Sequence, residues 1–189
     1  MDALDRPIFP DLTAKVLDIA TDDDPQLKIK AVEISAEQDI KQLIVDMVAT
    51  MKHAGGIGIA APQVRVSLRV MVFFLPTARD DVNHVGVPLT VLINPVVVPV
   101  GEDKVGDYEG CLSVPGMRGK VQRYRKIEYS GLDEHGVEIR RVAEGWHARL
   151  VQHEFDHLNG VLYPELMAEE DKLLTLEQWK ALTVVAASS

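Results

Sequence analysis

The feature that most constrains this chain is the pattern His-Glu-x-x-His at residues 153–157. Positions four residues apart on a helix lie one turn apart on the same face, so the imidazoles of His153 and His157 can reach one metal ion. Glu154 follows the first histidine, where its carboxylate can take a proton from a water bound to that metal. The pattern therefore predicts a metal-dependent hydrolytic site, although so short a match also arises by chance.

The residues around this pattern favour a helix. Trp146, Leu150, His153 and His157 follow one another at spacings of four, three and four residues, which places an apolar stripe on the face of the histidines. Asn159-Gly160 is a stop signal, because these residues readily adopt the left-handed conformation that closes helices. We therefore expect a helix that carries both histidines and ends near Gly160.

The third metal ligand has to be sought elsewhere. A catalytic site of this kind needs three protein ligands and an open position. The longer metzincin pattern would place a histidine at position 163, where this chain has a tyrosine. Cys111, the single cysteine, is the first candidate. A lone cysteine is more often a small buried residue than a ligand, so both interpretations stay open on this segment alone.

Length and composition indicate one globular domain, residues 1–189, with a sizeable core. The net charge of −9 and the absence of a Lys/Arg-rich run argue against direct binding of nucleic acid or anionic membranes. One cysteine excludes an internal disulfide and fits a reducing compartment. The acidic N-terminus lacks the apolar segment of a secretion signal, and no stretch approaches the roughly 18 apolar residues of a membrane span. We therefore expect a cytoplasmic protein.

The N-terminal third predicts one amphipathic helix. Residues 1–34 are expected to be irregular. A helix is predicted over 35–54, with Ser35 and Gln38 as a capping box at its start. Its apolar residues recur every three or four positions, which is typical of a helix packed on a core. His53 is expected to be exposed at its end.

β-Branched and aromatic runs predict most of the remaining elements, which are strands over 68–75, 89–98, 120–131 and 137–142, the last two as a hairpin. Pro95 and Pro99 indicate that the second strand is irregular at its end or lies at an edge. Pro115-Gly116 predicts a turn, and the linker 76–88 with its His84 is expected to be exposed. With a C-terminal helix around 173–182, the chain is expected to be α+β, with mainly antiparallel sheets packed around a central metal-binding helix.

The stretch 55–63 consists of small residues followed by Pro62 and Gln63. It lacks the Gly-Lys-Ser/Thr ending and the preceding strand of a phosphate loop. Small residues let a backbone approach a ligand or another segment closely. A tight helix-to-strand connection explains the same composition, so this stretch is weakly informative by itself.

Three motifs in order resemble the peptide deformylase family. They are Gly-x-Gly-x-Ala-Ala-Pro-Gln at 56–63, Glu-Gly-Cys-Leu-Ser at 109–113 and Gln-His-Glu-x-x-His at 152–157. The resemblance covers nearly the whole chain and is weakest in residues 1–34 and in the tail. It implies that the protein removes the N-terminal formyl group from formyl-methionyl nascent peptides.

The same resemblance implies roles for individual residues. Cys111, His153 and His157 would hold the metal, and a metal-bound water would attack the formyl carbon, with Glu154 as general acid/base. The Gln63 amide and the Leu112 backbone N–H would stabilise the oxyanion. The residues expected to bind substrate are Gly56, Ile57, Gly58, Glu109, Gly110, Arg118, Trp146 and Leu150. Among them, the glycine-rich backbone would pair with the extended peptide, Trp146 and Leu150 would line the methionine pocket, and Arg118 would lie at the rim.

One divalent metal ion is expected for each chain, with Fe²⁺ suggested first by the family. Zn²⁺, Ni²⁺ and Co²⁺ are compatible with the same ligands. The expected partners are formylated nascent peptides. Residues 165–189 contain five acidic residues and two lysines, so ribosome contact through this tail is not expected. The bacterial cytosol is the preferred location.

Two alternatives remain at this level. A zincin-like metallopeptidase would use a downstream ligand, and Glu177 is the residue at a suitable spacing. A non-enzymatic binding module that keeps the family's shape is the other. Substitution of Cys111 separates the first alternative from a deformylase, and a deformylation assay separates the second.

Overall fold

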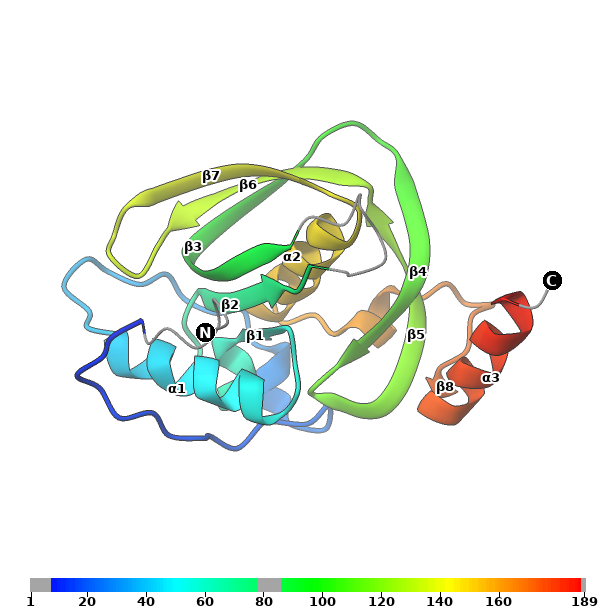
Figure 1. Ribbon diagram of the computed structural model, residues 1–189, viewed down its shortest axis with the longest axis horizontal. Helices are drawn as coiled ribbons and strands as arrows, with labels where there is room; N and C mark the ends of the chain where they lie inside the picture. Colours follow the sequence, from blue (N-terminus) through cyan, green and yellow to red (C-terminus); the bar gives the residue numbers. More distant parts are fainter. Residues whose placement is uncertain (1–7, 78–85, 188–189) are drawn as a thin grey trace.

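The computed structural model describes residues 8–77 and 86–187 (Figure 1). The helices and strands are, in chain order, η1 Pro25–Lys28, α1 Lys41–His53, β1 Gly58–Ala60, η2 Ala61–Val64, β2 Val70–Leu75, β3 Val87–Pro99, β4 Lys104–Cys111, β5 Val114–Tyr124, β6 Lys126–Leu132, β7 Glu138–Glu144, α2 Gly145–Leu158, η3 Tyr163–Leu166, β8 Leu174–Thr175 and α3 Leu176–Ala187, where η denotes a 3₁₀ helix. None of the helices in these ranges is long and apolar enough to cross a membrane.

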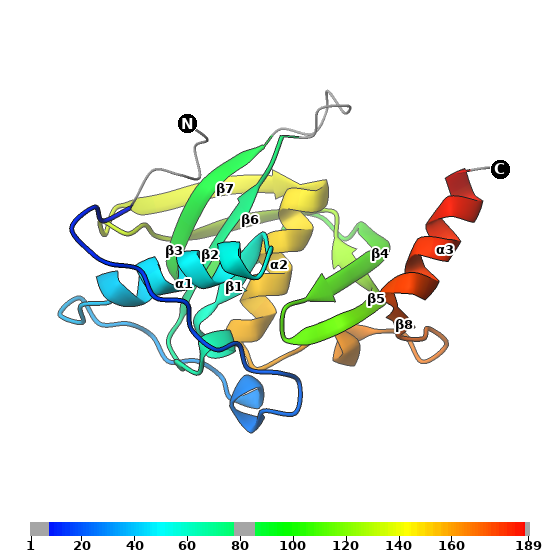
Figure 2. The ribbon, with the colours of Figure 1, turned by 60° about the horizontal axis from the view of Figure 1, so that its bottom comes forward.

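Two antiparallel sheets enclose helix α2. The larger sheet has the strand order β1-β2-β3-β6-β7, and the smaller has the order β4-β5-β8. Figures 1 and 2 show α2 running through the middle of the molecule, and it contacts strands of both sheets. The expectation of an α+β fold with mainly antiparallel sheets is confirmed.

Helix α1 packs on the larger sheet through the expected apolar stripe. Ile44, Met47 and Met51 are almost completely buried in a core cluster shared with strands β1, β2 and β3. The predicted start of the helix is wrong, because α1 begins at Lys41. The Gln38 N–H donates to the Ser35 carbonyl in a turn, so this pair closes the turn instead of capping the helix.

Two predictions need correction. The segment 120–131 is two strands, because the chain leaves the smaller sheet at Arg125 and joins the larger one as β6. Pro115-Gly116 lies inside β5, and the turn before it is Leu112-Ser113. Of the two interpretations of Pro95 and Pro99, the irregular strand fits, because β3 is central in the larger sheet. The two prolines are accommodated where the pairing register shifts between Ile93 and Val96, and at the last position of the strand.

Other predictions agree with the structure. Helix α2 ends at Leu158 before Asn159, His53 is exposed, and β6 and β7 form the expected hairpin. Residues 8–34 are irregular except for η1. Residues 1–7 and most of the linker 76–88, including His84, lie outside the described residues.

Candidate active site

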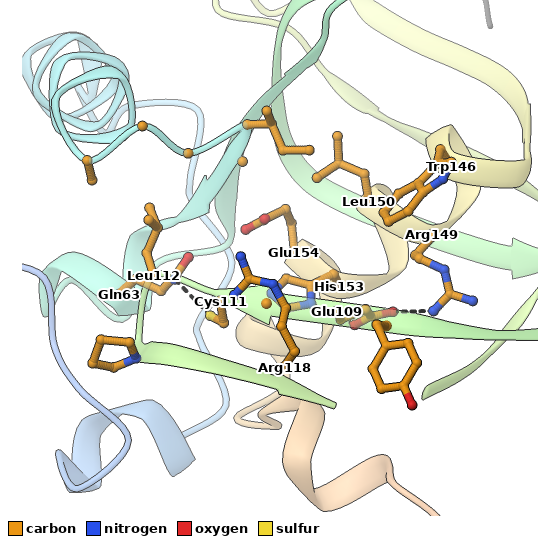
Figure 3. A pocket seen from close by; sticks show the side chains of 18 of the residues that line it. Gln63, Glu109, Cys111, Leu112, Arg118, Trp146, Arg149, Leu150, His153 and Glu154 are labelled. Carbon is orange, nitrogen blue, oxygen red and sulfur yellow. Dashed lines mark hydrogen bonds and ion pairs between the residues drawn. The ribbon is translucent and has the colours of Figure 1, made fainter. Parts of the chain in front are cut away.

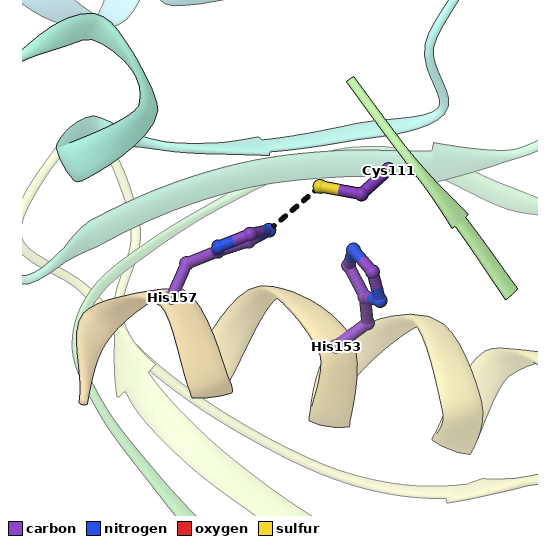
Figure 4. A group of neighbouring side chains, drawn as sticks. All are labelled: Cys111, His153 and His157. Atoms are coloured by element: carbon purple, nitrogen blue, oxygen red, sulfur yellow. Dashed lines mark hydrogen bonds between the residues drawn. The ribbon is translucent and has the colours of Figure 1, made fainter. Parts of the chain in front are cut away.

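The structure brings Cys111 together with the two histidines of the His-Glu-x-x-His pattern. His153 and His157 project from neighbouring turns of α2, and Cys111 is the last residue of β4 (Figure 4). Their ligand atoms all lie within 4.8 Å of one another, and the Cys111 Sγ lies 3.2 Å from the His157 Nε2. One thiolate and two imidazoles suit zinc or iron, so the three residues fit a divalent metal.

The charges of this group favour the ligating form of the cysteine. Burial by itself would raise the pKa of the Cys111 thiol. Hydrogen bonds and charge interactions with His157 and His153 outweigh burial and hold the pKa well below its usual value. A thiolate is the form of cysteine that binds metals. The three residues therefore suit a divalent metal by the chemistry of their donor atoms and by the protonation state of the thiol, as well as by the distances between those atoms.

Glu154 lies beside this group at the base of a cleft, 3% exposed. Burial raises its pKa to about 7, against the lowering effect of the two histidines. Its Oε2 has no hydrogen-bond partner among the described residues. A buried carboxylate with a free oxygen and a pKa near neutrality is suited to transfer protons.

Gly56 and Gly58 adjoin Leu112 and Glu154. A Cβ at Gly58 would collide with the carboxylate of Glu154, and one at Gly56 would come within 2.8 Å of the Leu112 side chain. These two positions therefore require glycine because the side chains of Glu154 and Leu112 occupy the adjoining space. The stretch 56–58 also forms the connection from α1 to β1, as the alternative interpretation held.

A buried charge cluster surrounds Glu109. Its carboxylate accepts hydrogen bonds from Arg149 (2.6 Å) and Arg123 (2.8 and 2.9 Å) and lies 2.8 Å from the His153 Nδ1. Burial would raise the pKa of Glu109, but the hydrogen bonds and charges of Arg123 and His153 hold it far below its usual value. Arg123 also pairs with Asp156, the residue before His157. Glu109 was expected to bind substrate, whereas its oxygens face the protein's own cations.

The two arginines were missed in the sequence. Arg149 carried a local signal, because it precedes His153 by four residues and therefore shares its helix face. Arg123 lies on β5 and carried no such signal.

Gln63 is held in one orientation. Its Oε1 accepts the Ala60 N–H at 2.8 Å, so the Nε2 points the other way. There it donates to the Ser113 Oγ at 3.1 Å and lies 3.5 Å from the Cys111 Sγ. Because a backbone N–H can face only the amide oxygen, the assignment of the two amide atoms follows from the network. The amide donor is therefore directed at the cysteine.

A cavity of about 540 Å³ opens over these residues (Figure 3). All eight residues expected to bind substrate line it, as do Gln63, Cys111, Leu112, His153 and Glu154. Trp146 and Leu150 lie one turn apart on α2, above Glu154. Four further residues line the cavity and were not expected from the sequence, namely Tyr108, Pro115, Arg149 and Trp179. Trp179 lies on α3, far along the chain from the three motifs, and no sequence pattern linked it to them.

The alternative ligand suggested by the sequence is Glu177. Within the described ranges, the group whose ligand atoms gather with His153 and His157 contains Cys111 and does not include Glu177. A zincin-like site that uses Glu177 is therefore not favoured.

Comparison with known proteins agrees with this geometry. Residues 16–173 match the family described as polypeptide deformylase. Peptide deformylase 2 of Pseudomonas putida is 48% identical over 126 residues, which span 67% of this chain and 71% of the relative. Peptide deformylase 1 of Bordetella pertussis is 51% identical over 126 residues, with 67% and 72% covered.

Solved structures give the same result. A class I type b peptide deformylase from Acinetobacter baumannii, crystallised with Met-Ala-Ser, aligns with a TM-score of 0.75 and 35% identity, covering 82% of this chain and 100% of that one. A peptide deformylase from Ehrlichia chaffeensis aligns with a TM-score of 0.75 and 34% identity, covering 92% and 97%. The chain belongs to the peptide deformylase family.

Proposed function

We propose that this protein is a metal-dependent hydrolase that removes the formyl group from formyl-methionyl peptides, releasing formate and a free N-terminus. The observation that carries the proposal is the group of Cys111, His153 and His157 beside the buried carboxylate of Glu154. The group lies at the base of a cavity large enough for a short peptide. We further propose that it acts in a bacterial cytosol, since the curated relatives are bacterial.

Cys111, His153 and His157 would hold the metal. When bound there, a divalent ion acts as a Lewis acid that polarises the formyl carbonyl and makes water a stronger nucleophile at neutral pH. Glu109 would fix the ring of His153 through its Nδ1, and Arg123 and Arg149 would fix Glu109. We assign Glu109 this positioning role in place of substrate binding.

Glu154 would act as general base and then as general acid. Its free oxygen takes a proton from the attacking water and later delivers it to the leaving nitrogen. Two hydrogen-bond donors would stabilise the oxyanion between these steps, namely the Gln63 Nε2 and the Leu112 backbone N–H. The anchoring of the Gln63 Oε1 supports its assignment, because a preorganised donor needs no reorientation during the reaction.

The cavity walls would bind the peptide. Trp146 and Leu150 offer an apolar surface above Glu154 for the methionine side chain. The backbone of 56–58 would pair with the extended peptide from one side, and β4 and β5 would contribute Gly110 and Arg118 from the other.

The decisive experiment is deformylation of formyl-Met-Ala-Ser by purified, metal-loaded protein, with formate release as the measurement. Cys111→Ser should lose both metal and activity, because a ligand is removed. His135→Ala, in the exposed turn before β7, is the control and should keep both. Retention of metal by Cys111→Ser, or absence of formate release by the loaded wild-type protein, would contradict the proposal.

We also propose Fe²⁺ as the working metal, because the thiolate and imidazole donors accept iron as readily as zinc. A thiolate on a redox-active ion makes a site sensitive to oxygen. Activity of the iron-loaded enzyme should decay in air, whereas nickel-loaded enzyme should persist. Equal stability of the two forms in air would exclude the oxygen sensitivity expected of an iron site.

A further inference from the structure

Helix α3 begins at a fixed place beside the cavity. Strand β8 pairs with β5, with Met117 opposite Thr175 and Arg118 opposite Leu174. Thr175 and Gln178 then form a reciprocal cap. The Thr175 N–H donates to the Gln178 side chain, and the Gln178 N–H donates to the Thr175 hydroxyl. Figures 1 and 2 show α3 leaving the body from this point. The strand pairing and the cap together anchor the first turn of the helix.

Trp179, on that first turn, lines the cavity. The guanidinium of Arg118 lies 5.7 Å from the centre of its indole ring, within the range of a cation–π contact. The same guanidinium covers Gly110, where a Cβ would collide with it, and donates to the Met117 carbonyl at 2.8 Å. Arg118 is therefore held between the β4 backbone and the tryptophan ring.

The other walls of the cavity are assigned to the formyl group and the methionine side chain, so this wall is available to the residues that follow methionine. The formyl group must reach Cys111 and Glu154, and the methionine side chain has the apolar surface of Trp146 and Leu150 on α2. Residues that follow methionine must leave the cleft elsewhere. Trp179 lies outside the residues that match the family, which end at 173, whereas Arg118 lies within them.

We propose that Trp179, together with Arg118, forms the outer wall of the peptide cleft and selects for the residues that follow formyl-methionine. The indole ring offers an apolar face to a downstream side chain, and the guanidinium donates to peptide carbonyls. The ligand is a formylated peptide of three or more residues. This inference rests on the proposed function, and its test is designed to separate the two.

The test compares peptides of increasing length, namely formyl-Met-Ala, formyl-Met-Ala-Ser and a formylated pentapeptide with leucine at the third position. Trp179→Ala should raise KM for the pentapeptide by roughly 5–10-fold, the loss expected when a contacting aromatic is truncated. The increase should shrink as the peptide is shortened, while kcat changes by less than about twofold, because the wall is remote from the reacting bond. Trp179→Phe should recover most of the loss.

Leu182→Ala is the matched control, because Leu182 lies on the same helix, is 51% exposed and does not line the cavity. It should behave as wild type at every length. A KM increase in Trp179→Ala that is equal for all three peptides, or no greater than that of Leu182→Ala, would overturn the inference.

Binding of the product supplies a readout without turnover. The chain has two tryptophans, Trp146 and Trp179. Titration of the metal-loaded protein with the deformylated pentapeptide should change the tryptophan fluorescence, and the change should be smaller in Trp179→Phe, in which Trp146 in the methionine pocket is the remaining reporter. A fluorescence change in Trp179→Phe as large as that of the wild-type protein would contradict the contact between Trp179 and the peptide. If Trp179 reports binding but no formate is released from any substrate, the proposed function fails while the peptide-binding wall stands.

Discussion

Helices α1 and α2 both pack against β1 and β2, yet they bury opposite kinds of side chain. The buried face of α1 is mainly apolar, with Ile44, Met47 and Met51 in the core. The buried face of α2 contains four ionisable residues, which are Arg149, His153, Glu154 and His157. Helix α1 therefore contributes mainly to the core, whereas α2 contributes to the core and also carries the residues that are proposed to react.

The buried polar face of α2 is tolerated because most of its polar side chains have hydrogen-bond or ion-pair partners. A buried charge without a partner costs several kcal/mol, whereas a hydrogen-bonded cluster offsets much of that cost. Arg149 donates to Glu109 and also to the carbonyls of Val105 and Val121, so it ties α2 to β4 and β5. Glu154 and His157 are the exceptions, since the Glu154 Oε2 and the His157 Nδ1 have no hydrogen-bond partner within the described ranges. The unpaired atoms therefore belong to the residue proposed to transfer protons and to one of the proposed metal ligands.

The sharpest test of this comparison is Glu154→Gln. The substitution keeps the size of the side chain but removes the proton acceptor. Activity on formyl-Met-Ala-Ser should fall by at least about 10²–10⁴-fold, the usual contribution of general acid–base catalysis. Metal content, measured by elemental analysis, should be unchanged, because Glu154 is not a proposed ligand. A variant that retained more than about a tenth of wild-type activity would contradict the assigned role.

A smaller loss is expected from Arg149→Met, which leaves Glu109 with Arg123 and His153. Changing a residue that supports a metal ligand typically costs about 10–100-fold in metal affinity or activity. The measurements are metal dissociation and kcat/KM. Arg140→Met is the control, because Arg140 pairs with Glu128 on the exposed surface of the hairpin. If the two variants lost equal activity, the buried cluster would have no positioning role.

On α1 the effect should appear in stability instead of turnover. Met47 is completely buried, so Met47→Ala should lower the free energy of unfolding by about 2–5 kcal/mol. The value of kcat, measured well below the unfolding temperature, should stay within about twofold of wild type, because no residue of α1 lines the cavity. Leu182→Ala, at an exposed position, should cost less than about 0.5 kcal/mol. A large fall in kcat for Met47→Ala would show that the two helices do not divide their roles.

The smallest effect is expected when the C-terminal tail with α3 is removed and ribosome binding is measured. Five acidic residues and two lysines over 165–189 give no phosphate-binding surface. Full-length protein and a truncation after Met167 should sediment with ribosomes to the same low extent at low salt. Tight, salt-sensitive binding that disappeared on truncation would disprove this prediction.

Local patterns anticipated much of the fold. The apolar stripe of α1, the strands β2, β3 and β7 and the C-terminal end of α2 followed from periodicity and stop signals. The start of α1 did not, because Ser35 and Gln38 form a turn with the same spacing as a capping box. The break at Arg125 was missed because alternation continues through it while the chain changes sheets.

The sequence by itself determined the spacing of His153, Glu154 and His157 on one helix face, because that geometry depends on helix periodicity alone. Their partners were decided by the tertiary structure. Cys111 meets His157 across 46 positions and Glu109 meets Arg149 across 40, and no local pattern encodes such contacts. The same holds for Trp179, which reaches the cleft only because β8 pairs with β5. Local spacing thus fixed the reactive face of α2, whereas its charge partners and the outer wall of its cleft depend on how the strands assemble.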